Sequence, residues 1–216
     1  MADSAALGLH VAGYSSATGR ELGRLTPGSV AFLLCDIQER FRDVIDRMPQ
    51  VIVSAKTMVQ GAEIFDVPLL VSEQYPKALG HTVSELNITR GKVFEKTKFS
   101  MCTNEFLAHL ESLGRKAVVI FGVETHVCVQ QTALDLLSRG YQVHILADGV
   151  SSQRPMDREF ALDRLRQSGC FVTTTESVLF ELLRSKDAPE FKNISGLAKS
   201  YAEQMRLATA ERSAVL

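Results

Sequence analysis

The sequence lacks several features that would assign it to a special class of protein. It contains no tryptophan, only six prolines and only four cysteines in 216 residues. The cysteines are widely spaced and form no CxxC pair, which argues against a disulfide scaffold and favours a reducing compartment. No apolar run approaches the roughly 20 residues that a membrane-spanning helix needs. We therefore expect a cytoplasmic protein without a membrane partner.

Other absences concern charge and cofactors. The net charge is −1 and acidic and basic residues are interspersed, so the basic footprint of a nucleic-acid-binding protein is missing. The five histidines form no HxH, HExxH or Asp-x-His cluster, so no metal site is predicted. No GxGxxG follows the first predicted strand, and no GxSxG elbow occurs. We therefore expect no cofactor and no nucleic-acid partner.

What is present is an alternation of strands and helices. Apolar runs predict strands over residues 29–35, 67–72, 92–95, 116–122, 142–147 and 170–174. Helical spacing predicts helices over residues 49–65, 104–113, 125–139, 156–167 and 176–184, with a last polar helix after Pro189. This alternation indicates an α/β fold with a doubly wound parallel sheet. We expect a flexible extension over residues 1–25, one domain over 26–205 and a tail over 206–216.

In such folds, ligands bind beyond the carboxyl ends of the strands. Asp36 directly follows the first strand, where it is either a chemical group or the cap of a turn. Lys96 follows the third strand, with Lys98 as a rival two residues later. A polar segment marked by proline and glycine, residues 73–80, predicts a binding loop or lid after the second strand.

Cys128 is the best-placed nucleophile. Only Glu124, Thr125 and His126 separate the fourth strand from an apolar-faced helix, so Cys128 is expected in the first turn of that helix. The helix dipole and free backbone N–H groups favour a thiolate there and offer donors for an oxyanion.

The remaining candidates are weaker. Cys35, Cys102 and Cys170 fall in predicted strands or a loop, as buried apolar residues do. His126 is expected to line or cap the turn. A role in thiol redox sensing would require a second thiol near Cys128, and the sequence spacing indicates none.

Three segments together resemble the isochorismatase-like cysteine hydrolases, a superfamily that includes nicotinamidases. They are LCDIQERF over residues 34–41, EKTKFS over 95–100, and GVETHVCVQQTALDLLSRG over 122–140. The segment VHILAD over 143–148 followed by Ser151 and Ser152 also fits, and EQYPKALG over 73–80 is similar to the eukaryotic isochorismatase domain-containing branch.

The resemblance implies a three-layer sandwich around a six-stranded parallel sheet in the order 3-2-1-4-5-6. It also implies a catalytic triad of Asp36, Lys96 and Cys128 and a cis peptide bond between Val123 and Glu124. By the same resemblance, the backbone N–H of Val123 or of Glu124, together with that of Cys128, holds the oxyanion. Four residues are expected to contact the substrate: Gln38, Phe41, Tyr75 and Phe99.

The function implied is that of a cysteine hydrolase, acting on a small amide or related acyl substrate through a thioester. Nicotinamidases carry Asp and His metal ligands after the second strand, and this sequence lacks that set, which argues against nicotinamidase activity. A small-molecule substrate and a homo-oligomer, dimer or tetramer, are expected. The alternatives are a catalytically silent interaction protein of the same fold and an isochorismatase-type ether hydrolase.

Overall fold

The computed structural model describes the backbone of residues 22–215 and the side chains of residues 22–210. The N-terminal extension expected over residues 1–25 lies mostly outside these residues. Six strands form one sheet, and every pair of neighbours is parallel. The order is β3-β2-β1-β4-β5-β6, which confirms the expected topology. The strands are β1 Val30–Cys35, β2 Leu69–Gln74, β3 Lys92–Lys96, β4 Ala117–Val123, β5 Gln142–Ser151 and β6 Phe171–Thr173.

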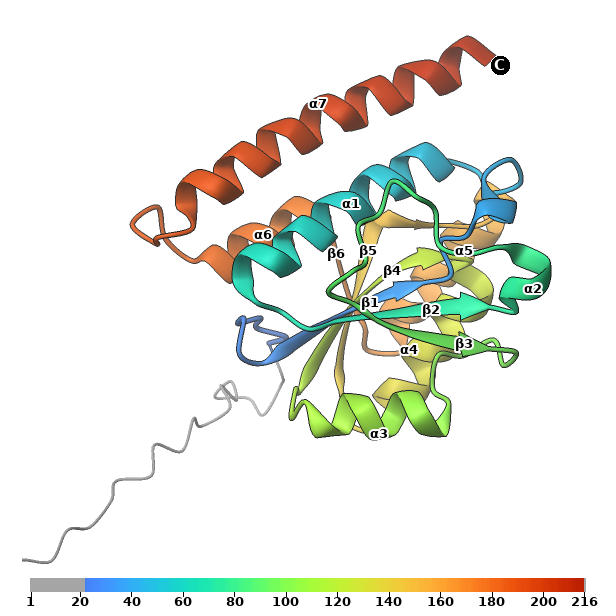
Figure 1. Cartoon of the computed structure of the whole chain (residues 1–216), viewed down its shortest axis with the longest axis horizontal. Helices are drawn as coiled ribbons and strands as arrows, with labels where there is room; N and C mark the ends of the chain where they lie inside the picture. Colours follow the sequence, from blue (N-terminus) through green and yellow to red (C-terminus); the bar gives the residue numbers. More distant parts are fainter. Residues whose placement is uncertain (1–21, 216) are drawn as a thin grey trace, which may run out of the picture.

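Helices cover both faces of the sheet and make three layers (Figure 1). One face carries α1 Met48–Phe65, α6 Thr175–Leu183 and α7 Phe191–Val215. The other face carries α3 Asn104–Ser112, α4 Gln130–Leu137 and α5 Pro155–Gln167. Two short helices, η1 Glu39–Phe41 and α2 Pro76–Leu79, follow β1 and β2 at the carboxyl edge. None of the helices in the described part combines the length and apolar character needed to cross a membrane.

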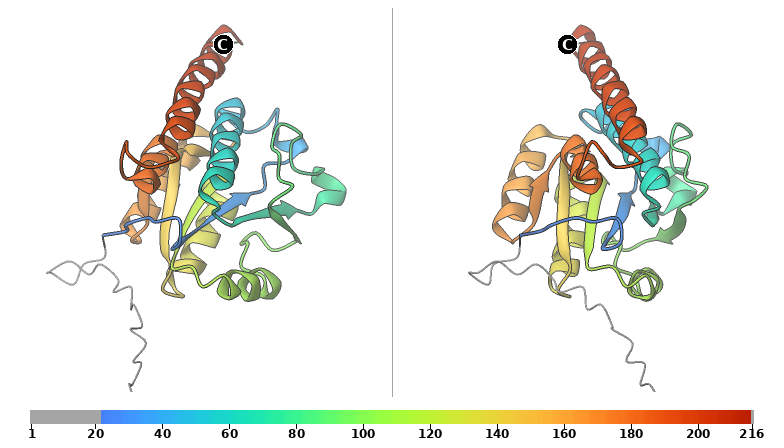
Figure 2. Two further views of the ribbon diagram at one scale, coloured as in Figure 1. Left: turned by 60° about the vertical axis from the view of Figure 1, so that its left-hand side comes forward. Right: turned by 90° about the vertical axis from the view of Figure 1, so that its left-hand side faces the viewer.

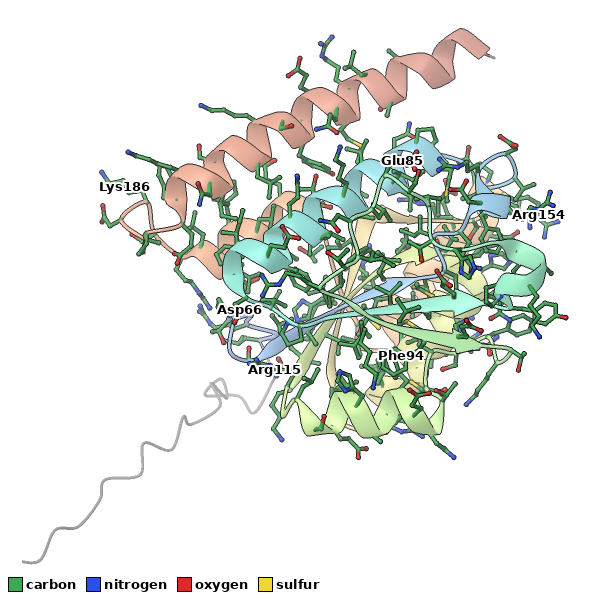
Figure 3. The ribbon with its side chains drawn as sticks, viewed as in Figure 1. Asp66, Glu85, Phe94, Arg115, Arg154 and Lys186 are labelled. Atoms are coloured by element: carbon green, nitrogen blue, oxygen red, sulfur yellow. The ribbon has the colours of Figure 1, made fainter. Side chains whose placement is uncertain are left out.

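The central strand β1 explains why the sheet holds together. All six of its residues are buried, as expected for a parallel strand covered on both faces. Successive side chains alternate, so Phe32 packs with the α1 layer and Leu33 with the α3 layer. Near the sheet edge, Phe94 meets Phe106 of α3 edge to face, with ring centroids 5.3 Å apart, and Figure 3 labels Phe94 in this layer.

Several strands run further than their apolar patterns predicted. β2 extends to Gln74, β3 includes Lys96 itself, and β5 continues to Ser151. The polar ends of these strands carry backbone pairing that hydropathy does not reveal, such as Gln74 beside Lys96. The single helix predicted over 125–139 is instead a π-helix, η2 Thr125–Val129, followed by α4. Cys128 therefore lies in a wider turn than a regular helix provides.

The long C-terminal helix α7 lies against α1 on the outside of the fold (Figures 1 and 2). The Tyr201 hydroxyl donates a 2.5 Å hydrogen bond to Asp148 of β5, and Gln50 of α1 donates to the Ala208 carbonyl at 3.1 Å. Asp148 also accepts hydrogen bonds from the backbone N–H and hydroxyl of Thr175 at the start of α6. Residues 206–215, expected as a tail, continue this helix.

Candidate active site

Asp36 is the first residue after β1, at the carboxyl edge of the sheet. Its backbone turns sharply there, with φ 51°, and its side chain is fully buried. Each carboxylate oxygen has a donor: the Ser72 hydroxyl bonds Oδ1 at 2.7 Å, and the Lys96 ammonium bonds Oδ2 at 2.7 Å. A buried carboxylate is stable only with such partners, so Asp36 is held in one position by β2 and β3.

Lys96 reaches this carboxylate from the end of β3. Its ammonium donates three hydrogen bonds: to Asp36 Oδ2 at 2.7 Å, to Gln74 Oε1 at 2.7 Å and to the Phe99 carbonyl at 2.8 Å. Burial alone would lower the pKa of Lys96. The negative charges that Cys35, Asp36 and Cys128 carry when deprotonated, together with the bond to Asp36, outweigh burial and raise that pKa above its ordinary value. The site therefore holds a fixed positive charge at neutral pH.

The rival Lys98 lies elsewhere. Its side chain is 58% exposed and its ammonium is 3.8 Å from Asp135 on the α4 surface. Lys96, whose side chain is 1% exposed, is therefore the lysine that contacts Asp36.

Cys128 joins this cluster from the η2 turn that follows β4. A thiolate at Cys128 would raise the pKa of Lys96, and a hydrogen bond from the Cys128 side chain raises the pKa of Cys35. The turn is fixed from the other side, because the Thr132 hydroxyl donates to the Cys128 carbonyl at 2.7 Å and accepts from the Met101 N–H at 2.9 Å. The three residues expected to form a triad thus arrive from β1, β3 and η2 at one sheet edge.

The other three thiols have different surroundings. Burial raises the pKa of Cys170 to about 12 and raises that of Cys102. Burial also raises the pKa of Cys35, and the hydrogen bond with Cys128 and the charge of Asp36 raise it further. These three cysteines are therefore protonated near neutral pH.

Sequence reasoning missed three members of the cluster. Cys35 is buried in the core as expected, and its sulfur in addition lies 3.7 Å from Asp36 Oδ2 and bonds Cys128. Ser72 and Gln74 were not singled out, although they bond Asp36 and Lys96. The only signal for all three was their place at the ends of β1 and β2.

The four expected substrate contacts are differently placed. Phe99 and Tyr75 are 52% and 49% exposed near Lys96, and Phe41 is half-buried against the core. A surface cavity of about 300 Å³ lies beside Tyr75, Lys77, Glu95 and Lys96.

Gln38 is fully buried, unlike the other three residues. Its Nε2 donates to the carbonyls of Gln74 and Gly80 at 3.0 and 2.6 Å, and its Oε1 accepts from the Gln74 N–H at 2.7 Å. A direct substrate contact through Gln38 stays a prediction that these bonds do not favour.

The turn before Cys128 is also ordered by side chains. The peptide bond between Val123 and Glu124 is cis, at the position that the resemblance implied. The Glu124 carboxylate accepts from the Gln153 N–H at 2.9 Å, and the Glu124 carbonyl accepts from the N–H of Val129 at 3.2 Å. His126 bonds the Ser152 hydroxyl at 2.9 Å at the rim of the turn. Among the described residues, no group of three or more His, Cys, Asp or Glu could hold a metal ion.

The fold agrees with the comparisons to known proteins. The sequence matches the Isochorismatase domain family over residues 30–177, and the chain belongs to the isochorismatase family. It is 50% identical over 188 residues to isochorismatase domain-containing protein 1 of Salmo salar, covering 86% of this chain. The match covers 66% of that relative, so the chain spans just under two thirds of its length.

Two solved structures extend the comparison. A structure of MAR1 ribonuclease from Caenorhabditis elegans is 40% identical, with a TM-score of 0.78 over 81% of this chain and 91% of that chain. An Escherichia coli structure described as an octameric hydrolase of unknown specificity is 22% identical, with a TM-score of 0.76 over 89% of this chain and 98% of that chain. This second likeness concerns the fold: the chain has the hydrolase fold of the isochorismatase family.

Proposed function

We propose that the protein is a cysteine hydrolase that cleaves a small amide or related acyl substrate through a thioester. One observation carries the proposal: the Lys96 ammonium is buried against Asp36, 2.7 Å from its carboxylate, at the sheet edge where β4 leads into the turn that carries Cys128. A thiolate is the nucleophilic form of cysteine, and a nearby cation favours it. Burial raises the pKa of Cys102 and of Cys170, so neither thiol is a candidate nucleophile at neutral pH.

In the first chemical step, Asp36 accepts the proton of the Cys128 thiol, and Lys96 stabilises the thiolate. The sulfur attacks the carbonyl carbon, and backbone N–H groups of Glu124 and Cys128 are the proposed donors to the oxyanion. The C–N bond then breaks, and Asp36 returns the proton to the departing amine or ammonia.

Water completes the reaction. Asp36 accepts a proton from a water molecule, whose oxygen attacks the thioester carbon. The C–S bond breaks, the acid product leaves, and the Cys128 thiol is restored. No metal or cofactor is needed for this proton and acyl transfer.

Selective alkylation tests the proposed nucleophile. The four cysteines fall in four different tryptic peptides, residues 25–40, 99–115, 117–139 and 167–184. With limiting iodoacetamide at pH 7, we expect the label in the peptide over 117–139 first. Lys96→Met should slow this labelling, whereas Lys98→Met should leave it unchanged. Equal labelling of all four peptides in the native protein would contradict the proposal.

A substrate screen tests the reaction class. We expect release of ammonia or amine from at least one member of a panel of small linear and cyclic amides. Cys128→Ala should abolish this release and retain the fold, and Cys170→Ala is the matched control that should keep it. Undiminished hydrolysis by Cys128→Ala would refute the assignment.

The same panel separates the alternatives. A vinyl ether substrate tests the ether hydrolase, and an RNA oligonucleotide is included because one relative is described as a ribonuclease. A protein that cleaves nothing in the panel and shows no selective labelling would match the silent interaction protein. Homo-oligomerisation stays a prediction, which sedimentation velocity of the full chain would test.

A further inference from the structure

Cys35 and Cys128 lie side by side although they are far apart in the sequence. Cys35 ends β1, and its partner in the neighbouring strand β4 is Gly122. A Cβ atom added to Gly122 would lie 2.0 Å from the Cys35 carbonyl oxygen, so the two backbones meet directly here. β4 ends one residue later, and the η2 turn that carries Cys128 begins at Thr125. The turn is thereby anchored beside Cys35.

The two thiols are in contact and both are reduced. Their side chains share a hydrogen bond, and the Cys35 sulfur is also 3.7 Å from Asp36 Oδ2. Both side chains belong to the same buried cluster, and a disulfide requires their sulfurs to approach to about 2 Å. Neither of the other two cysteines is placed in this way: Cys102 faces the Thr132 carbonyl at 4.0 Å, and Cys170 opens the segment before β6.

We propose that Cys128 and Cys35 form a peroxide modification site, in which Cys35 captures oxidised Cys128 as an intramolecular disulfide. The inference rests on the proposed reactivity of Cys128. The Cys128 thiolate attacks hydrogen peroxide, the O–O bond breaks, and a sulfenic acid and hydroxide form. Peroxide is the oxidant, and the Cys128 sulfur is oxidised by two electrons.

The second step uses Asp36 as a base. Asp36 accepts the proton of the Cys35 thiol, and the Cys35 sulfur attacks the Cys128 sulfur. The S–O bond breaks, the disulfide forms, and the leaving hydroxide takes up a proton to become water. Such a disulfide blocks the proposed nucleophile, protects it from irreversible oxidation and is reversed by a dithiol.

Cys35 is suited to this task and not to the first step. Burial keeps its pKa high, so it stays protonated and unreactive toward peroxide. It becomes a nucleophile only when Asp36 removes its proton, after Cys128 has been oxidised. Cys128 is therefore the thiol that reacts with peroxide, and Cys35 is the thiol that then forms the disulfide with it.

Peptide mapping tests the site in the full chain. After treatment with hydrogen peroxide, alkylation and tryptic digestion, we expect peptides 25–40 and 117–139 joined, with the loss of two hydrogens. Dithiothreitol should separate them and restore alkylation of Cys128. In Cys35→Ala and Cys35→Ser, Cys128 should instead gain two or three oxygens, and dithiothreitol should not reverse this. Cys170→Ala should behave as the native protein does.

The outcomes separate this inference from the proposed function. Cys128 could be alkylated selectively under reducing conditions and yet be oxidised to sulfinic acid at equal rates with and without Cys35. That result would overturn the proposed disulfide site and leave the assignment of Cys128 as nucleophile standing. Absence of selective alkylation would overturn both. The native protein alone decides whether the joined peptides form, so the inference does not depend on the folding of a variant.

Discussion

Replacing Lys96 by methionine should destabilise the protein strongly, because it leaves a buried carboxylate without its counter-ion. The Lys96 and Asp36 side chains are 1% and 0% exposed and their charged atoms are 2.7 Å apart. After Lys96→Met, the Ser72 hydroxyl at 2.7 Å and the Cys35 thiol at 3.7 Å would still donate to Asp36, and neither carries a positive charge. Removing one partner of a buried ion pair costs about 3–5 kcal/mol. For a domain of this size, that is a fall in Tm of roughly 6–20 °C.

Urea unfolding followed by circular dichroism measures this loss, with two controls. Lys98→Met removes an exposed lysine and should change stability by less than about 0.5 kcal/mol. The double variant Asp36→Leu/Lys96→Met removes both charges and should be more stable than Lys96→Met alone, since no unpaired charge stays buried. A Lys96→Met protein within about 1 kcal/mol of the native protein would refute the reasoning from the buried pair.

The pH dependence supplies an independent check. Lys96 has a folded-state pKa above its ordinary value of 10.5. The stability that it contributes is therefore complete below pH 10.5 and is lost as the pH rises through the folded-state pKa. The stability difference between the native protein and Lys96→Met should accordingly be constant at neutral pH and shrink in alkaline solution.

Two further predictions concern the scaffold. His144 is buried against Phe171, and burial lowers its pKa from 6.5 to about 4. The free energy of unfolding should therefore fall by up to about 3 kcal/mol between pH 6.5 and 4. Chemical denaturation of His144→Phe over this range should show a weaker pH dependence of stability, and an unchanged pH dependence would exclude His144 as its source. Gly122→Ala places a Cβ atom 2.0 Å from the Cys35 carbonyl oxygen at a φ of 124°, so we expect stability to fall by more than about 4 kcal/mol, or no folded protein. Gly114→Ala has open space around it and should lower the stability measured by urea unfolding by about 1 kcal/mol. Equal effects of the two alanines would contradict the close approach at Gly122.

The apolar pattern predicted a parallel α/β sheet because burial on both faces of such a sheet leaves continuous apolar runs, as in β1. The strand order came from the resemblance to the isochorismatase-like hydrolases. It also brought Asp36, Lys96 and Cys128 to one edge, since the carboxyl ends of parallel strands meet there. Ser72 and Gln74 were not predicted as site residues, because the register of the strands decides that they face Asp36 and Lys96. No local sequence pattern encodes that register.

The helix after β4 was wrong in form for a related reason. Helical spacing of apolar residues is almost the same for a π-turn and a regular α-helix over five residues. The difference lies in backbone bonding, where the Val129 N–H reaches back to the Glu124 carbonyl. Residues 206–215, of which five are polar and five apolar, are expected as a tail from the sequence, and α7 continues through them.

The bond from Tyr201 to Asp148 ties the outermost helix to a central strand of the sheet. Asp148 simultaneously holds the first turn of α6 through Thr175. A chain shortened before Tyr201 would remove a donor from a half-buried carboxylate and uncover the apolar side of α1. The same strand β5 ends at Ser151, which pairs with Val123 just before the turn that carries Cys128, so the outer helix and this turn are both attached to β5.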